Sequence, residues 1–238
     1  MTCRRSLKQK TERILPVYAH IPLATVVCVN MLAYFATRPL TQGWAHYDLS
    51  LPVDGMLPFV PAFSLFYLLA YVQWVVGYIL IARESRELCY RMLSGEIIAK
   101  LTCMALFLIL PTAMVRPEIT SDDIFGKITA YIYRFDAADN LFPSIHCLES
   151  WICFRGAVQL KKTGRWYRWV TLGFTLLVFA SVVLIKQHVV ADIAAGVLVC
   201  EAGQFLAKRI DSARVFRRIE AHFHKKETDL EKSHEKIC

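Results

Sequence analysis

The sequence predicts an all-α protein that crosses a membrane six times, with both termini in the cytoplasm. Three observations lead to this prediction. Hydrophobic side chains make up 55% of the 238 residues and charged ones only 20%, whereas soluble domains are about 45–50% apolar. The apolar residues are gathered into long blocks. When these blocks are taken as crossings, most Lys and Arg residues fall on one side of the membrane, which orients the chain.

A helix that crosses the hydrocarbon core needs about 20 mostly apolar residues. We expect six such helices, at residues 14–36, 56–82, 95–115, 144–160, 167–185 and 189–207. The fourth has weak hydropathy because Glu149 and Arg155 interrupt it, and we include it because the charges then alternate correctly. The expected organisation is a basic cytoplasmic N-terminus at 1–13, one six-helix domain at 14–207 and a basic cytoplasmic tail at 208–238.

The net charge of +8 is distributed unequally between the two sides. The side assigned to the cytoplasm holds Arg4, Arg5, Lys8, Lys10, Arg13, Arg83, Arg86, Arg91, Lys161, Lys162, Arg165, Arg168 and every Lys and Arg from Lys208 onward. The opposite side holds Arg38, Arg116, Lys127, Arg134 and Lys186. The basic residues therefore edge a membrane bundle, whose expected partners are membrane lipids; contact of the tail from Lys208 onward with anionic headgroups is left open. A nucleic-acid-binding protein would gather them on a soluble face, so we expect no nucleic-acid partner.

Residues able to carry chemistry converge on the non-cytoplasmic side, at helix ends that are far apart in the sequence. Ionisable residues at membrane depth are costly, so their placement indicates function. They flank the end of the third expected helix and the starts of the fourth and sixth. In chain order they are Arg116, Ser144, His146, Lys186, His188 and Asp192.

The two histidines and the aspartate have the pattern of a phosphoryl-transfer site. His188 and Asp192 lie four residues apart on one helical face. The carboxylate can fix one imidazole nitrogen and leave the other as a nucleophile. His146, in the first turn of its helix, can donate a proton to a leaving oxygen. Together these residues indicate a reaction through a covalent phosphohistidine.

The remaining residues are suited to binding a phosphate. Ser144 is a good helix N-cap, and the amides that follow it form an anion seat. Arg116 adds a forked cation. Each piece also has a structural alternative, such as an interfacial histidine or a helix-terminating Arg-Pro pair. Two histidines and an aspartate could bind zinc instead, but cations beside a phosphate seat disfavour a metal. We expect neither metal nor cofactor.

These motifs resemble those of a known family. Arg116-Pro117, then Phe142-Pro143-Ser144-Ile145-His146, then His188-x-x-x-Asp192 are similar to the three signature motifs of the type 2 phosphatidic acid phosphatase superfamily. The resemblance covers roughly residues 50–207. It implies that His188 is the nucleophile, Asp192 its orienting partner and His146 the acid for the leaving group, in a metal-independent reaction. Asp54, Pro58-Phe59-Val60-Pro61, Tyr67 and Tyr71 resemble the branch that contains inositol phosphorylceramide and sphingomyelin synthases.

The sequence departs from the phosphatase pattern at two positions, and each departure removes a cation that would bind the phosphate. Ile109 stands where the pattern has a lysine, and Val182 stands where it has an arginine; Lys186 is the candidate to compensate. We therefore expect a membrane enzyme that acts on a lipid phosphate at an extracytoplasmic site, with hydrolysis favoured over transfer to an alcohol. Phosphatidate, a polyprenyl diphosphate and a ceramide-type acceptor all remain open as substrates. A non-catalytic transporter or scaffold is the alternative of another class.

Overall fold

The computed structural model describes residues 14–223, whose regular structure is helical. Five helical segments are long and apolar enough to cross a membrane: Val17–Thr41, Pro61–Glu84, Arg86–Ile109, Trp166–Leu184 and Val190–Arg209. The chain is therefore an all-helical, multi-pass membrane protein. The expected N-terminal tail at 1–13, and the expected C-terminal tail from 224 onward, lie outside the described residues.

The first crossing is one continuous helical segment of changing pitch. It consists of η1 (Val17–Ala19), α2 (His20–Met31), the π-helical η2 (Leu32–Ala36) and α3 (Thr37–Thr41). The elements that follow are α4 (Pro52–Met56), η3 (Pro61–Phe63), α5 (Ser64–Glu84), α6 (Arg86–Ile109), α7 (Ile124–Phe135), α8 (Ile145–Gln159), α9 (Trp166–Leu184) and α10 (Val190–Arg209). A further helical stretch covers residues 213–223.

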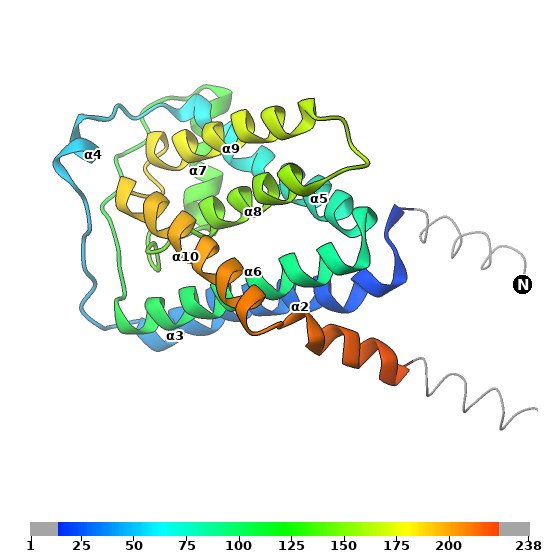
Figure 1. Ribbon diagram of the computed structural model, residues 1–238. Coiled ribbons are helices and arrows are strands. Elements are labelled where there is room, and N and C mark those ends of the chain that lie inside the picture. Colours follow the sequence, from blue (N-terminus) through cyan, green and yellow to red (C-terminus); the bar gives the residue numbers. More distant parts are fainter. Residues whose placement is uncertain (1–13, 224–238) are drawn as a thin grey trace, which may run out of the picture.

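The long helices form one bundle around α6, which contacts α2, α5, α8 and α10 (Figure 1). The α5–α6 junction, the α8–α9 loop and both ends of the described chain lie at one end of the bundle. We call it the basic end, because Arg83, Lys161, Lys162 and Lys208 lie there. The opposite end carries α4, α7 and the starts of α8 and α10. We call it the site end.

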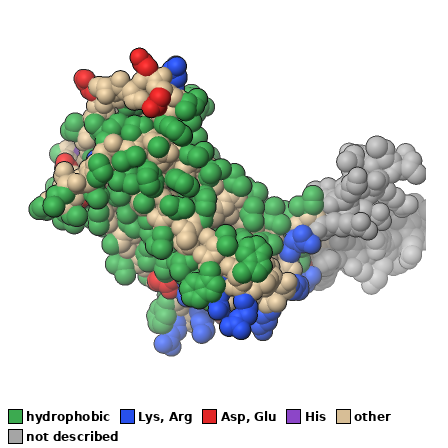
Figure 2. Space-filling model, turned by 90° about the horizontal axis from the view of Figure 1, so that it is seen from above, with side chains coloured by type: hydrophobic (Ala, Val, Ile, Leu, Met, Phe, Trp, Pro, Cys, Tyr) green, Lys and Arg blue, Asp and Glu red, His purple; other side chains and the backbone are tan. Residues whose placement is uncertain are grey.

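The outer surface suits a lipid environment. Figure 2 shows a broad hydrophobic face, with Lys and Arg side chains gathered along one edge and acidic side chains toward the opposite edge. Large apolar side chains of α5 and α9 are more than half exposed, including Val72, Val75, Trp169 and Leu176. Such a surface would be a liability in water and is expected against lipid.

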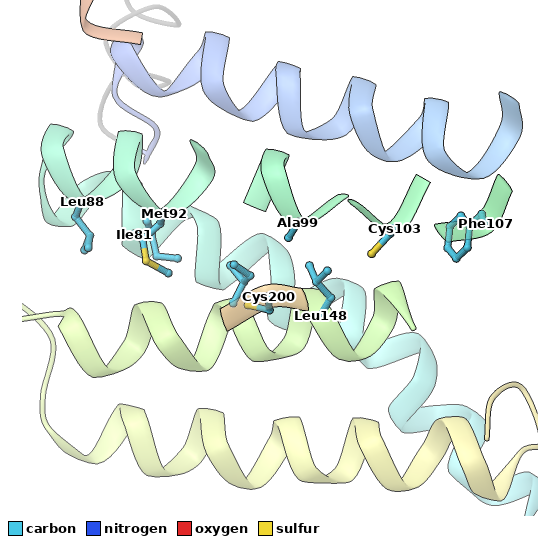
Figure 3. Packing of buried hydrophobic residues seen from close by; sticks show 9 residues of the cluster. Ile81, Leu88, Met92, Ala99, Cys103, Phe107, Leu148 and Cys200 are labelled. Carbon is cyan, nitrogen blue, oxygen red and sulfur yellow. The ribbon is translucent and has the colours of Figure 1, made fainter. Parts of the chain in front are cut away.

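The core is packed where α6 faces α8 and α10. In Figure 3, Ala99, Cys103 and Phe107 of α6 lie opposite Leu148 of α8 and Cys200 of α10. The helices approach closely because small residues line their contacts. A Cβ atom at Gly203 would lie 2.5 Å from the carbonyl oxygen of Gly95, so α10 crosses α6 nearly backbone to backbone.

The α8 helix is shorter than any of the five candidate crossings, and its charged residues have partners on neighbouring helices. Its 15 residues span about 22 Å, less than the roughly 30 Å hydrocarbon core. Glu149 pairs with Lys100 of α6, and Lys100 Nζ also lies 2.9 Å from Glu96 Oε1. Arg155 lies 3.0 Å from Glu201. Paired charges of this kind are tolerated inside membrane bundles.

Several expected boundaries are wrong. The third helix was expected at 95–115, but α6 begins at Arg86, because Ser85 caps it by accepting a hydrogen bond from Leu88 N at 3.1 Å. Arg86 and Arg91 are therefore helical residues and not loop residues. The first crossing continues beyond residue 36 to Thr41, through the π-helical turn. The expected loop between Arg116 and Ser144 contains α7.

The loops at the site end are fastened to one another. Tyr47 pairs with Thr112, and Ala113 pairs with Asp139, as isolated backbone bridges. Thr112 Oγ1 accepts hydrogen bonds from Leu141 N and Phe142 N, both at 3.0 Å. Three loops distant in sequence thus form one frame over the starts of α8 and α10.

Candidate active site

His188 and Asp192 form a fixed pair at the start of α10. His188 Nδ1 lies 3.1 Å from Asp192 Oδ2, and the same oxygen accepts a hydrogen bond from Val189 N at 3.0 Å. Because the carboxylate can only accept, Nδ1 carries the proton. The other nitrogen, Nε2, is then free of its proton and can act as a nucleophile. Asp192 is 1% exposed, so water competes little for its contacts.

His146 faces this pair from the first turn of α8. The ring centroids of His146 and His188 are 6.3 Å apart. Ser144 is the N-cap of α8, and its hydroxyl accepts a hydrogen bond from Cys147 N at 3.3 Å. His146 Nε2 is buried and has no hydrogen-bond partner among the described residues. Its proton or lone pair is therefore available to a bound group.

The two helix starts are held together by their backbones. Ser144 N donates a hydrogen bond to Asp192 O at 3.1 Å. One helical turn further along α10, a Cβ atom at Gly196 would lie 2.6 Å from Ser144 O. Only glycine allows this close approach. Gly196 thus permits the spacing between the two histidines, which the motifs alone do not explain.

Aromatic residues of α5 fix the ring of His146. Tyr67 stacks on it with centroids 4.2 Å apart, Trp74 lies at 5.2 Å and Tyr71 meets it edge-on at 5.7 Å. Tyr67 OH also lies 3.5 Å from His146 Nδ1. These contacts restrict the orientation of the imidazole.

Arg116 lies in the loop between α6 and α7, and its side chain reaches the C-terminal end of α7. Its Nη1 and Nη2 donate hydrogen bonds to the carbonyl oxygens of Tyr133 (3.2 Å) and Asp136 (2.7 Å), and its guanidinium lies 4.4 Å from the centre of the Tyr133 ring. Burial lowers the pKa of Arg116, while nearby Asp136 opposes that shift; arginine stays charged even so. Arg116 Nε is buried without a partner in the described part of the chain.

Lys186 is tied to α4. Its Nζ donates hydrogen bonds to the carbonyl oxygens of Asp54 and Leu57, both at 2.8 Å. The Asp54 carboxylate in turn accepts a hydrogen bond from Val190 N at 2.8 Å. Lys186 has a left-handed backbone with φ of 52°, which turns the chain from α9 into α10. Its ammonium group has one donor left for a ligand.

Two cavities meet at His188. Cavity A, of about 270 Å³, also contains His146, whereas cavity B, of about 510 Å³, also contains Arg116 and Lys186. Ser144 and Asp192 lie behind the two walls and line neither. Cavity A is lined by Asn30, Met31, Tyr34, Phe35, Tyr71, Trp74, Phe107, Phe135, Asp136, Ala137, Asp139, Asn140, Leu141, Ile145, His146, Gln187 and His188. Cavity B is lined by Ser50, Asp54, Gly55, Leu57, Phe59, Met114, Val115, Arg116, Pro117, Val183, Lys186, His188 and Val189.

Comparison with known proteins gives the family. A family model described as the PAP2 superfamily matches residues 44–206. The chain belongs to the PAP2 superfamily. Neither curated proteins nor solved structures gave a match. The narrower resemblance to inositol phosphorylceramide and sphingomyelin synthases stays a prediction.

The superfamily match includes every residue that we predicted for the site, but it begins after the first crossing. In this PAP2 protein the first crossing nevertheless lines cavity A, through Asn30, Met31, Tyr34 and Phe35. Tyr34 and Phe35 belong to the π-helical turn η2. π-Helical turns are frequent at functional sites, and this one forms part of the cavity wall outside the shared motifs.

The sequence analysis missed Asp136, which follows α7 and lines cavity A. It accepts hydrogen bonds from Tyr34 OH at 2.8 Å and from Tyr67 OH. Burial alone would raise the pKa of Asp136. The nearby His146 and the two tyrosine hydroxyls outweigh burial and hold the pKa below its usual value. Asp136 is therefore a carboxylate beside His146, and no motif in the sequence signals it.

The described residues contain no group of three or more His, Cys, Asp or Glu side chains placed to hold a metal ion.

Proposed function

We propose that the protein is an integral membrane lipid phosphatase that works through a phosphohistidine on His188. Membership of the PAP2 superfamily supports a phosphatase or phosphotransferase of lipids. The observation that carries the proposal is the placing of His188. It is oriented by Asp192 at 3.1 Å, faces His146, and lies where the cationic cavity B meets cavity A.

The reaction has two steps. His188 Nε2 attacks the phosphorus atom of the lipid phosphate, the bond from phosphorus to the leaving oxygen breaks, and His146 gives that oxygen a proton. Asp192 stabilises the positive charge that forms on His188. Water then attacks the phosphohistidine, gives its proton to His146 and releases phosphate. Arg116 and Lys186, on the side of cavity B, are placed to offset the charge of the phosphoryl oxygens.

We further propose that α8 is the sixth crossing and that the active site is extracytoplasmic. Support comes from the division of charge, because Arg83, Lys161, Lys162 and Lys208 lie at the basic end and cytoplasmic loops carry the excess of Lys and Arg. Six crossings also suit the position of both described chain ends at that same end (Figure 1). The localisation we propose is a cell membrane.

The test is turnover of a radiolabelled lipid phosphate panel by the protein in detergent, with and without EDTA. His188→Ala should lower the rate at least about a thousandfold, as removal of a nucleophile does elsewhere. Rapid acid and base quenches should find acid-labile, base-stable label on the wild type and none on His188→Ala. His20→Ala is the matched control. His20 is the first residue of α2, whereas cavity A is lined by Asn30 and Met31 at the last turn of that helix. Full turnover by His188→Ala would overturn the mechanism, and inhibition by EDTA would point to a metal.

A further inference from the structure

Three side-chain amides that line cavity A have an oxygen atom without a hydrogen-bond donor in the described chain. Gln187 Oε1, Asn140 Oδ1 and Asn30 Oδ1 are buried and have no hydrogen-bond partner among the described residues. Gln187 is only 2% exposed and Asn140 only 6%. Their amide nitrogens face away, toward Tyr67 OH at 3.5 Å and Thr37 Oγ1 at 2.9 Å. A buried acceptor without a donor is destabilising, so these oxygens are suited to a ligand that brings donors.

The charges of cavity A disfavour a phosphate group and favour a neutral one. Asp136 and Asp139 line it, whereas no Lys or Arg does so within residues 14–223. Asp139 is paired with Arg38 at 2.9 Å, and Asp136 accepts hydrogen bonds from Tyr34 and Tyr67. Anionic oxygens and unpaired amide oxygens would repel a phosphate. Both carboxylates already have a partner, a cation for Asp139 and two hydroxyl groups for Asp136, so the unpaired amide oxygens require neutral donors, which hydroxyl groups supply.

We propose that cavity A is a subsite for a polyhydroxy alcohol and that Asn30 determines its selectivity. This inference rests on the proposed function and adds what the phosphohistidine reacts with. A hydroxyl group in cavity A lies beside His146, the proton carrier, and near His188, while the phosphoryl group lies toward cavity B. The other hydroxyl groups of the alcohol meet the amide oxygens of Asn30, Asn140 and Gln187.

The added step is a transfer in which the alcohol replaces water. The alcohol oxygen attacks the phosphorus atom of the phosphohistidine, and the bond from phosphorus to His188 Nε2 breaks. The proton of the attacking hydroxyl passes to His146 Nε2, which is buried and without a partner in the described chain. The products are a phosphate ester of the alcohol and free His188. No oxidant, reductant or metal is needed for the balance.

Asn30 is the residue to test, because it comes from the first crossing, outside the superfamily match. It directly precedes Met31, after which the π-helical turn begins. Within the described chain Asn30 makes no hydrogen bond to either histidine and lines cavity A, so it is placed to act on the alcohol rather than on the phosphoryl group. Leucine has nearly the same size and is well tolerated in a membrane helix.

The experiment measures how the phosphoryl group is divided between two alcohols. A soluble aryl phosphate is the donor, and glycerol or 1-propanol, which have the same number of carbon atoms, is the acceptor. The wild type should form glycerol phosphate at least about tenfold more efficiently per hydroxyl group than propyl phosphate. Asn30→Leu should lower this ratio about fivefold and raise the glycerol concentration for half-maximal transfer. Asn30→Ala is the second variant, should Asn30→Leu fail to fold.

Thr25→Val is the matched control. Thr25 is exposed on the same helix and hydrogen-bonds only to Ile21 O of its own turn, so the ratio should not change. A wild-type ratio near one, or a ratio unchanged in both Asn30 variants, would overturn the subsite while aryl phosphate turnover persists. Absence of aryl phosphate turnover in the wild type, or its persistence in His188→Ala, would instead overturn the proposed function and the subsite with it.

Discussion

At the scale of single residues, Arg116 has both a structural and a chemical use. Its two terminal nitrogens hold the carbonyl oxygens at the end of α7, and its side chain also lines cavity B. A lysine keeps the charge but cannot donate to two carbonyl oxygens and a phosphate in one plane. The rigid fork is therefore needed at this position.

We expect Arg116→Lys to lower kcat/KM for a lipid phosphate about a hundredfold, in the range seen when one transition-state donor is removed. Steady-state kinetics in detergent would measure the loss, and a melting curve would show whether α7 remains docked. Lys127→Arg, on the exposed side of α7, serves as the control. An unchanged rate would leave Arg116 as a support for α7 alone.

The loss of rate on replacing His146 should be larger for substrates whose leaving oxygen needs a proton. We expect His146→Ala to slow hydrolysis of an alkyl phosphate by at least about a hundredfold, as general-acid contributions of this size are common. An aryl phosphate with an acidic leaving group should lose much less, because it departs without a proton. Parallel assays with both esters give the comparison, and equal losses would argue against the acid role.

The catalytic residues of the motifs could be predicted from the sequence, because their residue types and their spacing indicate the chemistry. The prediction that His188 and Asp192 share one helical face is wrong, because His188 precedes α10; they meet because Asp192, in the first turn of α10, reaches back to His188 and to Val189 N. Asp136 could not be found from residue types and spacing, and neither could the stacking of Tyr67 on His146, because these contacts depend on how α7 and α5 pack over α8. The same holds for cavity A, whose wall includes Asn30 from more than a hundred residues before His146.

At the scale of elements, α8 shows why hydropathy can underestimate a buried helix. Glu149 weakens its apolar character in sequence, but in the fold it is 4% exposed and paired with Lys100. Tyr78 OH donates to Glu149 and, at 2.5 Å, to Glu96 Oε1. α7 was missed for a different reason. It has only 12 residues, with its apolar side chains on one face, whereas a membrane crossing is recognised from about 20 mostly apolar residues.

Lys100 should be needed to keep Glu96 and Glu149 buried side by side. Lys100→Met leaves Glu96 and Glu149 together without a cation, and breaking such a buried pair costs about 3–5 kcal/mol. We expect a clear drop in melting temperature in detergent. A triple variant with Lys100→Met, Glu96→Gln and Glu149→Gln removes all the charges and should regain much of the loss. Equal melting temperatures for wild type and Lys100→Met would contradict the importance of the cluster.

At the scale of the whole molecule, the bundle separates two chemically different ends. Lys and Arg side chains gather along one edge of the surface in Figure 2, and the hydrophobic face lies between that edge and the acidic one. The histidines lie at the site end, at the starts of α8 and α10. Charge counting anticipated this separation well, because it depends on the order of helices and not on their exact limits.

Cysteine labelling tests the orientation and the sixth crossing together. A membrane-impermeant maleimide should label Asp122→Cys in intact cells and should label Lys161→Cys only after the membrane is opened. Both positions are exposed. Cys89 is unsuitable as a reporter because it is buried. Labelling of both sites from outside would show that α8 does not cross, and the reverse pattern would invert the protein.

Trp74 gives the site a natural optical signal. Its indole lies 5.2 Å from the His146 ring, lines cavity A and is held by a 3.0 Å hydrogen bond from Nε1 to Ser150 Oγ. His146 gains and loses a proton in each turnover of the proposed reaction, so the electric field at this indole changes with it. The emission of Trp74 should therefore brighten and dim in step with the chemistry, which would let stopped-flow fluorescence follow single turnovers without a labelled substrate.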